Sequence, residues 1–314
     1  MKPTIICIVG PTSSGKSAVA ARLARKINGE VVSCDSMQVY KDMDVITRPP
    51  GEYLLSLAVH HLIKTLPPEE EFSAARFAAE AKGIIESISS KGKVPIVAGG
   101  TGLYMKALVD GIFPSPPKDK DLRRKLCAIV SEKGKEYLHA RLKEVDPQTA
   151  SRLHPNDTRR VIRALEVYEL TGRTINAKKT ESEGVSMNYD CRMFGLSLPR
   201  KMLYERIDSA VDEMFEEGLV EEVKRLNTRR LSLTAEKALG IKEVSAFLNG
   251  QVDLEKAKKE LKKNTRRYAK RQLTWVRPDR RVIWVNANRG VEEIVEDIVN
   301  RLQAAGYKLQ ACSL

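Results

Sequence analysis

The segment GPTSSGKS, residues 10–17, has the spacing of a phosphate-binding loop, with a lysine and a serine directly after its second glycine. Such a loop directs backbone N–H groups and the positive end of the following helix at an anion. Lys16 adds positive charge, and Ser17 offers a hydroxyl to a magnesium ion. The motif therefore predicts a diphosphate-like ligand with Mg²⁺, without identifying the molecule that carries the diphosphate. The predicted contacts are Gly10, Pro11, Thr12, Ser13, Ser14, Gly15, Lys16 and Ser17.

A carboxylate and an amide follow the next apolar run. In EVVSCDSMQVY, residues 30–40, the run ends at Asp35, which should emerge at the same sheet edge as the phosphate-binding loop. Asp35 could hold magnesium, accept a proton from an acceptor substrate, or cap a turn. Gln38 carries an amide, the group that reads adenine through bidentate hydrogen bonds. The pair therefore favours a purine acceptor.

A second glycine-rich turn lies at residues 99–102. The apolar run KVPIVA precedes it and a helical pattern follows it, so Thr101 is expected at a helix N-terminus that faces the same cleft. Two roles are open for the Thr101 hydroxyl. It could cap the helix, or it could donate to a diphosphate oxygen as charge develops on a leaving group.

A scaffold of alternating strands and helices must position these residues. Apolar runs of strand length lie at 4–9, 30–34, 93–98, 192–198 and 281–285, with helical patterns between them. This alternation predicts an α/β fold, a mostly parallel sheet with helices on both faces. Prolines within 113–117 interrupt the alternation, and the residues after them are helical and charged. We expect a catalytic core at 1–115 and 186–314, with a helical insertion at 116–185.

Composition narrows the class of protein. The 314-residue chain is 42% hydrophobic, as expected of a globular protein, and its formal net charge of +13 favours a polyanionic partner. Its five cysteines are dispersed and include no C-x-x-C pair, so neither a disulfide framework nor a zinc site is predicted. No apolar window has the length of a signal-peptide core or a membrane span. We expect a cytoplasmic protein with no membrane association.

A basic helix is predicted near the C-terminus. Residues 255–281 hold twelve Lys or Arg against three acidic residues. The basic residues that recur at helical spacing are Lys256, Lys259, Lys263, Arg266 and Lys270, and Leu254, Leu261, Tyr268 and Trp275 lie roughly opposite them. An apolar stripe should therefore pack inward. The basic face could be a solvated surface, or it could follow the phosphates of a nucleic acid.

Five segments together resemble a known family. GPTSSGKS, CDSMQVY, GGTGLYMKAL, HPNDTRRVIRALEVYELTG and KRQLTW occur in the order and spacing of the tRNA dimethylallyltransferases, also called tRNA isopentenyltransferases. The resemblance covers residues 5–275. It implies a P-loop fold related to nucleotide kinases, whose loop holds the diphosphate of dimethylallyl diphosphate. It also implies Mg²⁺-assisted transfer of the dimethylallyl group to N6 of adenine 37 in the tRNA anticodon stem-loop, with release of diphosphate. A monomer is expected.

The resemblance assigns roles residue by residue. It implies that Asp35 is the general base that contacts N6, that Thr101 lies with Lys16 at the reacting centre, and that Arg206 is directed at the diphosphate. It implies tRNA contacts from Asp35, Ser36, Met37, Gln38, Thr101, Arg123, Arg159, Arg160, Val161, Ile162 and Arg163, and it favours a phosphate-following role for Lys259, Lys263 and Arg266. Ile241 stands where the family usually has a tyrosine. Three alternatives stay open: an ATP-dependent small-molecule kinase, an adenylate isopentenyltransferase and a non-enzymatic RNA-binding switch.

Overall fold

The structure is a computed structural model that describes residues 2–112, 119–175 and 183–307. The chain divides into two compact units, which we call the core unit, Met1–Val109 with Val185–Leu314, and the inserted unit, Asp110–Gly184. The boundaries predicted from the sequence, 115/116 and 185/186, lie close to these junctions. Among the described residues, no helix is both long enough and apolar enough to cross a membrane.

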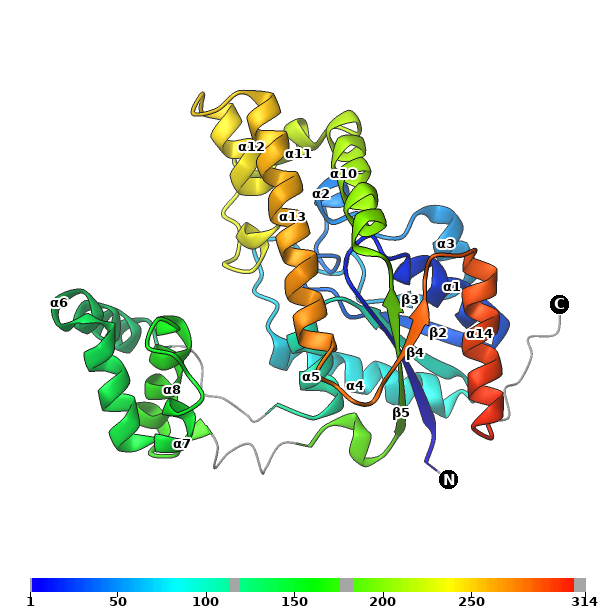
Figure 1. Cartoon of the computed structure of the whole chain (residues 1–314), viewed down its shortest axis with the longest axis horizontal. Coiled ribbons are helices and arrows are strands. Elements are labelled where there is room, and N and C mark those ends of the chain that lie inside the picture. The colour runs from blue at the N-terminus through cyan, green and yellow to red at the C-terminus, as the bar shows by residue number, and fades with distance from the viewer. Residues whose placement is uncertain (1, 113–118, 176–182, 308–314) are drawn as a thin grey trace. The chain divides into compact units, whose positions relative to one another are not determined.

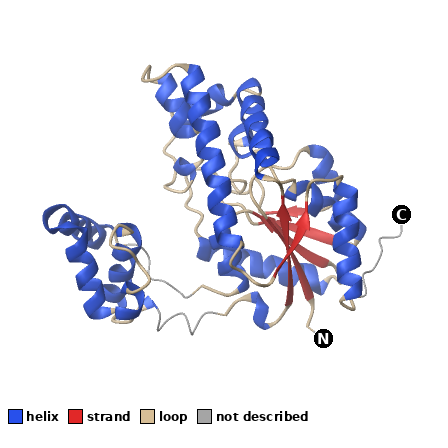
Figure 2. Ribbon diagram, viewed as in Figure 1, coloured by secondary structure: helices blue, strands red, loops and turns tan. Residues whose placement is uncertain are grey.

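The core unit is built on a parallel six-stranded sheet (Figure 2). The strands are β1 (Thr4–Val9), β2 (Gly29–Ser33), β3 (His60–His61), β4 (Val94–Gly99), β5 (Asp190–Ser197) and β6 (Val282–Asn286), in the order β3-β2-β4-β1-β5-β6. The predicted parallel α/β sheet is therefore confirmed, and each of the five predicted runs is a strand within two residues of its expected bounds. Strand β3 was not predicted, because two residues are too few to form a periodic pattern.

Helices cover both faces of this sheet (Figure 1). Helices α1 (Lys16–Lys26) and α14 (Val291–Ala304) pack on one face, where Ile8, Leu23 and Ile298 are buried in one apolar cluster. Helix α4 (Ala74–Ser90) packs on β2 and β4, and α5 (Gly102–Val109) lies beside it. Because the central strands are buried on both sides, they read as continuous apolar runs and were recognisable in the sequence.

A second group of helices lies beyond the carboxyl ends of the strands. Helices α10 (Arg200–Glu216) and α13 (Leu254–Val276) pack against each other there (Figure 1), and ion pairs such as Asp208–Arg266, at 3.1 Å, join them. The shorter elements of the core unit are α2 (Asp44–Thr47), α3 (Glu52–Leu57), η1 (Val185–Met187), α11 (Leu219–Leu226), η2 (Ala235–Lys237) and α12 (Ile241–Leu248). Ligands of parallel sheets collect at this edge.

The inserted unit is helical and has its own apolar core. It contains α6 (Lys120–Val145), α7 (Pro147–Ala150) and α8 (Thr158–Thr171). Asp119 caps α6 by accepting hydrogen bonds from Asp121 N and Leu122 N, and Gly134 interrupts the helix with a φ of 85°. The core includes the buried side chains of Leu138 and Leu165. This packing of helices against one another is expected for a segment with no strand pattern.

Candidate active site

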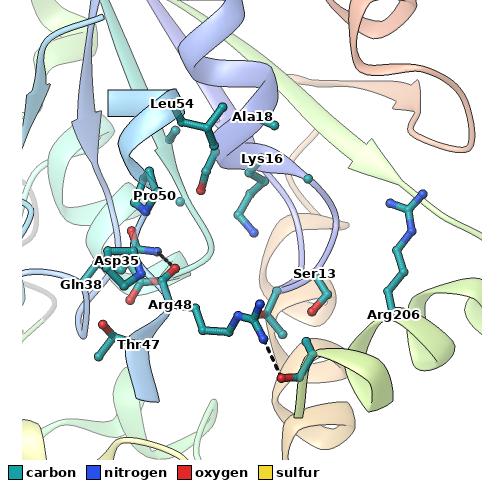
Figure 3. A pocket seen from close by; sticks show the side chains of 18 of the residues that line it. Ser13, Lys16, Ala18, Asp35, Gln38, Thr47, Arg48, Pro50, Leu54 and Arg206 are labelled. Carbon is teal, nitrogen blue, oxygen red and sulfur yellow. Dashed lines mark hydrogen bonds between the residues drawn. The ribbon is translucent and has the colours of Figure 1, made fainter. Parts of the chain in front are cut away.

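A cavity of about 540 Å³, which we call the phosphate chamber, lies at the carboxyl edge of the sheet. Its wall comes from the phosphate-binding loop, the end of β2, residues 47–51, α10 and α13. Figure 3 shows Lys16, Asp35 and Arg206 around this cavity, each on a different element. Three residues that were predicted to act together therefore share one cavity, although 190 positions separate the first from the last.

The phosphate-binding loop joins β1 to α1. Gly15 has a φ of 89°, a left-handed conformation that glycine adopts without strain. Lys16 Nζ donates to the Pro11 carbonyl at 2.6 Å, and burial lowers the pKa of Lys16 to about 8, although nearby Asp35 raises it. Thr12, Ser13, Gly15, Lys16 and Ser17 line the chamber. Ser14 is buried, and Gly10 permits close approach to Leu196. These two predicted contacts are not among the residues that line the chamber.

Asp35 follows β2, and the structure shows its predicted role in the turn after the strand. Its Oδ1 accepts a hydrogen bond from Met37 N at 2.9 Å, so the carboxylate stabilises the turn after the strand. The side chain also lines the phosphate chamber. Because a carboxylate has two oxygens with several acceptor positions, the turn leaves Asp35 able to accept a proton or bind a metal.

A second cavity of about 310 Å³, the apolar chamber, adjoins the first. The two share Asp35, Thr12, Ser13, Thr47, Arg48, Ala210 and Tyr268. The wall specific to the second is mostly hydrophobic and includes Ile46, Ile207, Val211, Met214, Leu239 and Leu261. Ser36 and Met37, both predicted tRNA contacts, also line it. Asp35 therefore lines both a polar chamber that contains Lys16 and Arg206 and a chamber whose own wall is mostly apolar.

Gln38 lines the phosphate chamber, but its amide is engaged by the protein. Its Oε1 accepts from Ser33 Oγ at 3.0 Å, and its Nε2 donates to the Arg48 carbonyl at 3.2 Å. Each end of the amide keeps one further acceptor or donor position, so the interpretation of Gln38 as an adenine reader stays a prediction. Gln38 also fixes the loop that carries Arg48.

Arg48 is a site residue that the sequence did not reveal. Its guanidinium donates to the Ala210 carbonyl and to Glu213 Oε2, each at 2.7 Å, and so joins the loop after α2 to α10. It lines both chambers. Its local sequence, ITRPP, has no motif, and its partners lie more than 160 positions away. No local pattern could have identified it.

Two residues of α13 reach into the site and were also missed. Gln272 is buried, and its Oε1 accepts from Thr12 N of the phosphate-binding loop at 2.8 Å. Tyr268 lines both chambers, and burial, followed by the nearby Asp35 carboxylate, raises its pKa to about 12, although hydrogen bonds with Thr101 and Gln272 lower it. The predicted basic and apolar sides of the helix placed Tyr268 on the inward stripe, but they did not indicate that Tyr268 and Gln272 line the cavity.

The second glycine turn has no room for side chains at two of its positions, because other backbone and side-chain atoms approach it closely. A Cβ at Gly99 would lie 2.0 Å from the Cys34 carbonyl oxygen, and one at Gly100 would lie 2.1 Å from Gln272 Nε2. The Thr101 hydroxyl accepts from Ser36 N at 3.2 Å and is hydrogen-bonded to Tyr268. Thr101 therefore ties the segment after β2 to α13, one contact away from Asp35. A role of the Thr101 hydroxyl as a hydrogen-bond donor to the diphosphate stays a prediction.

The basic face of α13 is partly exposed and partly paired. Lys259 and Lys263 are exposed, and Lys263 also pairs with Glu260 one turn earlier. Arg266, the third predicted RNA contact of this helix, pairs with Asp208 of α10. The predicted apolar stripe is only half correct. Leu261 is buried and Tyr268 partly so, but Leu254 and Trp275 are exposed, and Ala257, Ala269 and Gln272 occupy the buried side instead.

The predicted RNA contacts of the inserted unit fall into three groups. Arg159 and Arg160 are exposed on α8. Arg123 and Arg163 both pair with Glu166, at 2.6 and 2.8 Å, and this glutamate is fully buried. The side chains of Val161 and Ile162 are buried in the core of the unit. The prediction of RNA contact through those two side chains is therefore corrected, because they stabilise the fold of the unit.

The residues around the phosphate chamber fit a magnesium ion bound mainly by its ligand. Ser17 and Asp35 both line the chamber. Within the described ranges, no group of three or more His, Cys, Asp or Glu side chains could form an all-protein cage. Mg²⁺ commonly takes only one or two protein ligands and completes its shell with phosphate oxygens and water. Ser17 and Asp35, which line the same chamber, would supply such a partial ligand set.

Comparison with known proteins agrees with this geometry. The family model described as IPP transferase matches residues 38–279. A tRNA dimethylallyltransferase of Halothermothrix orenii is 45% identical over 290 residues, 91% of this chain and 88% of that protein, and one of Geobacter sulfurreducens is 46% identical over 286 residues, 90% and 92% of the two chains.

Solved structures are similar over nearly the whole chain. The full-length tRNA isopentenylpyrophosphate transferase of Bacillus halodurans is 40% identical with a TM-score of 0.72 and 96% of each chain covered. A eukaryotic dimethylallyltransferase captured acting on tRNA is 30% identical with a TM-score of 0.79, covering 98% of this chain and 82% of that one. With its phosphate-binding loop, its following carboxylate and this likeness over nine-tenths of its length, the chain belongs to the IPP transferase family.

Proposed function

We propose that this protein transfers the dimethylallyl group of dimethylallyl diphosphate to N6 of adenine 37 in tRNA and releases diphosphate. The observation that carries the proposal is the place of Asp35 between the two chambers. A donor in the phosphate chamber and an amine in the apolar chamber would meet at this carboxylate. Group transfer between them needs such a meeting point, whereas hydrolysis does not.

The charges of the phosphate chamber suit a departing diphosphate. In the transfer, the bond between the allylic carbon and the diphosphate oxygen breaks, and its electron pair leaves with the diphosphate. The loop amides, Lys16 and Arg206 stabilise the negative charge that develops there. Magnesium bound at Ser17 would neutralise part of the same charge. Donors aimed at developing charge in a partly desolvated site are the strongest contribution that a protein makes to such a step.

The carboxylate of Asp35 handles the acceptor. An exocyclic adenine amine is a weak nucleophile, and it loses a proton as its bond to the allylic carbon forms. Asp35 can orient the amine, accept that proton and pass it to water. Positioned general bases typically contribute a factor of about 10² to 10⁴ in rate. The hydrogen bond from Met37 N holds one carboxylate oxygen in place, so the other can face the amine.

The experiment that tests this function locates the transferred group. The protein is incubated with dimethylallyl diphosphate labelled in its hydrocarbon, Mg²⁺ and unmodified tRNA, and the tRNA is digested to nucleosides. The proposal expects the label on N6-dimethylallyladenosine from position 37, with one diphosphate released per label. Label on AMP supplied as a competing acceptor would instead identify an adenylate isopentenyltransferase. Consumption of ATP with a phosphorylated product would identify a kinase, and tRNA binding with no transfer would identify an RNA-binding switch.

A further inference from the structure

An exposed tryptophan lies beside the second glycine turn. Trp275 of α13 is 44% exposed, and Leu103 of α5 is 50% exposed. A Cβ on Gly102 would meet Trp275 Cβ at 2.7 Å and Cγ at 2.9 Å, so the side chain rests on the bare backbone between Thr101 and Leu103. Large aromatic side chains are usually buried over most of their area. Here one side of Trp275 is packed against Gly102, and much of the rest is open.

Trp275 continues a stripe that begins inside the site. Tyr268 lies seven residues earlier, and seven residues are close to two full turns of an α-helix, so the two rings project from the same side of α13. Arg271 lies between them, lines the apolar chamber, and has its guanidinium 5.6 Å from the centre of the Tyr268 ring. Tyr268 itself borders the cavity at Asp35. Flat π-surfaces therefore follow one another from the proposed reacting centre to the outside of the molecule.

The charge and chemistry of this stripe suit a single-stranded nucleic acid. Arg271, one turn before Trp275, and Lys106, one turn after Leu103, are both exposed cations. Aromatic rings and arginine planes stack unpaired bases, while neighbouring cations bind the backbone phosphates. An adenine that leaves the stack of its loop also deprives its neighbour of a stacking partner, at a cost of a few kcal/mol. A protein surface that restacks the neighbour offsets that cost.

We propose that Trp275 and Leu103 form a stacking platform for an unpaired base that neighbours the target adenine in the RNA loop. This inference rests on the proposed tRNA substrate and adds a binding surface outside the two chambers. Arg271 and Lys106 bind phosphates beside the platform. Trp275 takes no part in binding the diphosphate, because it does not line the phosphate chamber, where the phosphate-binding loop and Arg206 lie.

The chain allows a direct optical test, because it contains two tryptophans. The second, Trp284, is a partly buried residue of β6. A Trp284→Phe variant leaves Trp275 as the single indole, and titration with an unmodified anticodon stem-loop should quench its fluorescence as a base stacks on it. A stem-loop labelled with fluorescein at its far end reports binding independently, through anisotropy.

Substitutions distinguish stacking on the Trp275 ring from the effects of charge and of altered packing. Trp275→Leu keeps apolar bulk without a π-face and should weaken stem-loop binding about 5- to 150-fold, whereas Trp275→Phe should keep most of the affinity. Trp275→Leu should leave unchanged the slope of the logarithm of the binding constant against the logarithm of the salt concentration. Arg271→Gln should reduce the magnitude of this slope by about one. The KM for the allylic donor should not change with Trp275→Leu. Leu254→Ser, which alters an exposed side chain at the opposite end of α13, is the matched control and should bind normally.

The outcomes distinguish this inference from the proposed function. If the wild-type protein does not bind the stem-loop, the tRNA function fails and the platform fails with it. If the stem-loop binds and is modified, but Trp275 fluorescence is unchanged and Trp275→Leu binds like the wild type, the function stands and the platform is refuted. Quenching together with selective loss of affinity in Trp275→Leu establishes the platform.

Discussion

The hydrogen bond that Thr12 N of the phosphate-binding loop donates to Gln272 Oε1 permits a quantitative prediction. Gln272→Met keeps nearly the same volume at this buried position but removes the acceptor of Thr12 N. A neutral hydrogen bond of this kind contributes about 0.5–1.5 kcal/mol, and a donor left unpaired costs more. Thr12 is only partly buried, so water can reach its N–H in the free protein. We therefore expect a loss of about 1 kcal/mol from stability, which lowers the Tm by roughly 2–4 °C.

The effect on donor binding should be larger than the effect on folding. A bound diphosphate excludes water from the loop, so Thr12 N then lacks any partner, and the loop is less well ordered before binding. We expect the Kd for magnesium diphosphate, measured by titration calorimetry, and the KM for the allylic donor to rise about 5- to 30-fold, corresponding to about 1–2 kcal/mol. The Kd for tRNA measured without donor should stay within about two-fold, because the lost hydrogen bond joins α13 to the phosphate-binding loop, which is not among the predicted tRNA contacts.

Two further variants determine whether the loop contact is responsible. Gly100→Ala places a Cβ 2.1 Å from Gln272 Nε2 and should reproduce the rise in donor KM by displacing the amide. Thr274→Ala changes an exposed residue of the same helix and should leave the KM unchanged. If Gln272→Met lowers the Tm as expected but binds diphosphate with wild-type affinity, Gln272 is only a packing residue and the reasoning is refuted.

Four other predictions follow from the site. Asp35→Asn keeps the acceptor for Met37 N but cannot take a proton, so kcat should fall about 10²- to 10⁴-fold with tRNA affinity retained; single-turnover rates near wild type would contradict this. The pKa of Lys16 is about 8, and the charged form binds the anion, so the donor KM should be constant below pH 8 and rise above it, by up to about ten-fold per pH unit; Lys16→Met should abolish this dependence, and a flat wild-type profile to pH 9.5 would disprove the cause. Buried Glu222 accepts from Val45 N and Ile46 N, at 3.0 and 2.8 Å, so Glu222→Ala should lower the free energy of unfolding in urea by about 2–4 kcal/mol, with Glu221→Ala as the near-neutral control. Gly99→Ala should cost about 3 kcal/mol or more because its Cβ would lie 2.0 Å from the Cys34 carbonyl oxygen, whereas Gly83→Ala in α4, where a Cβ meets nothing within 4 Å, should stabilise by about 0.5–1 kcal/mol; equal stability of these two variants would argue against the close approach.

Local sequence determined the strands and helices of the scaffold and two polar parts of the site, the phosphate-binding loop and Asp35. Buried parallel strands are continuous apolar runs, and a phosphate-binding loop depends on the spacing of glycine, lysine and serine within eight residues. Asp35 could be placed near that loop because the carboxyl ends of parallel strands meet at one edge. The inserted unit was recognisable because prolines end the strand–helix alternation. Each of these inferences uses only residues that are near one another along the chain.

Tertiary packing alone decided which side chains complete the site. Gln272 reaches Thr12 across 260 positions, and Arg48 reaches Ala210 across 162, and neither contact leaves a trace in the local pattern. Gln38 gained a structural role because Ser33 and Arg48 each bond one end of its amide, and the side chains of Val161 and Ile162 are unavailable for RNA contact because the helices of the inserted unit bury them. On α13, spacing predicted a basic side and an apolar side, but the rotation of the helix against α10 and the glycine turn buried Gln272 and left Trp275 open. The sequence of a helix specifies which residues share a face; only its packed neighbours determine which of those residues touch the substrate, because that depends on a rotation and a separation that no local interaction sets.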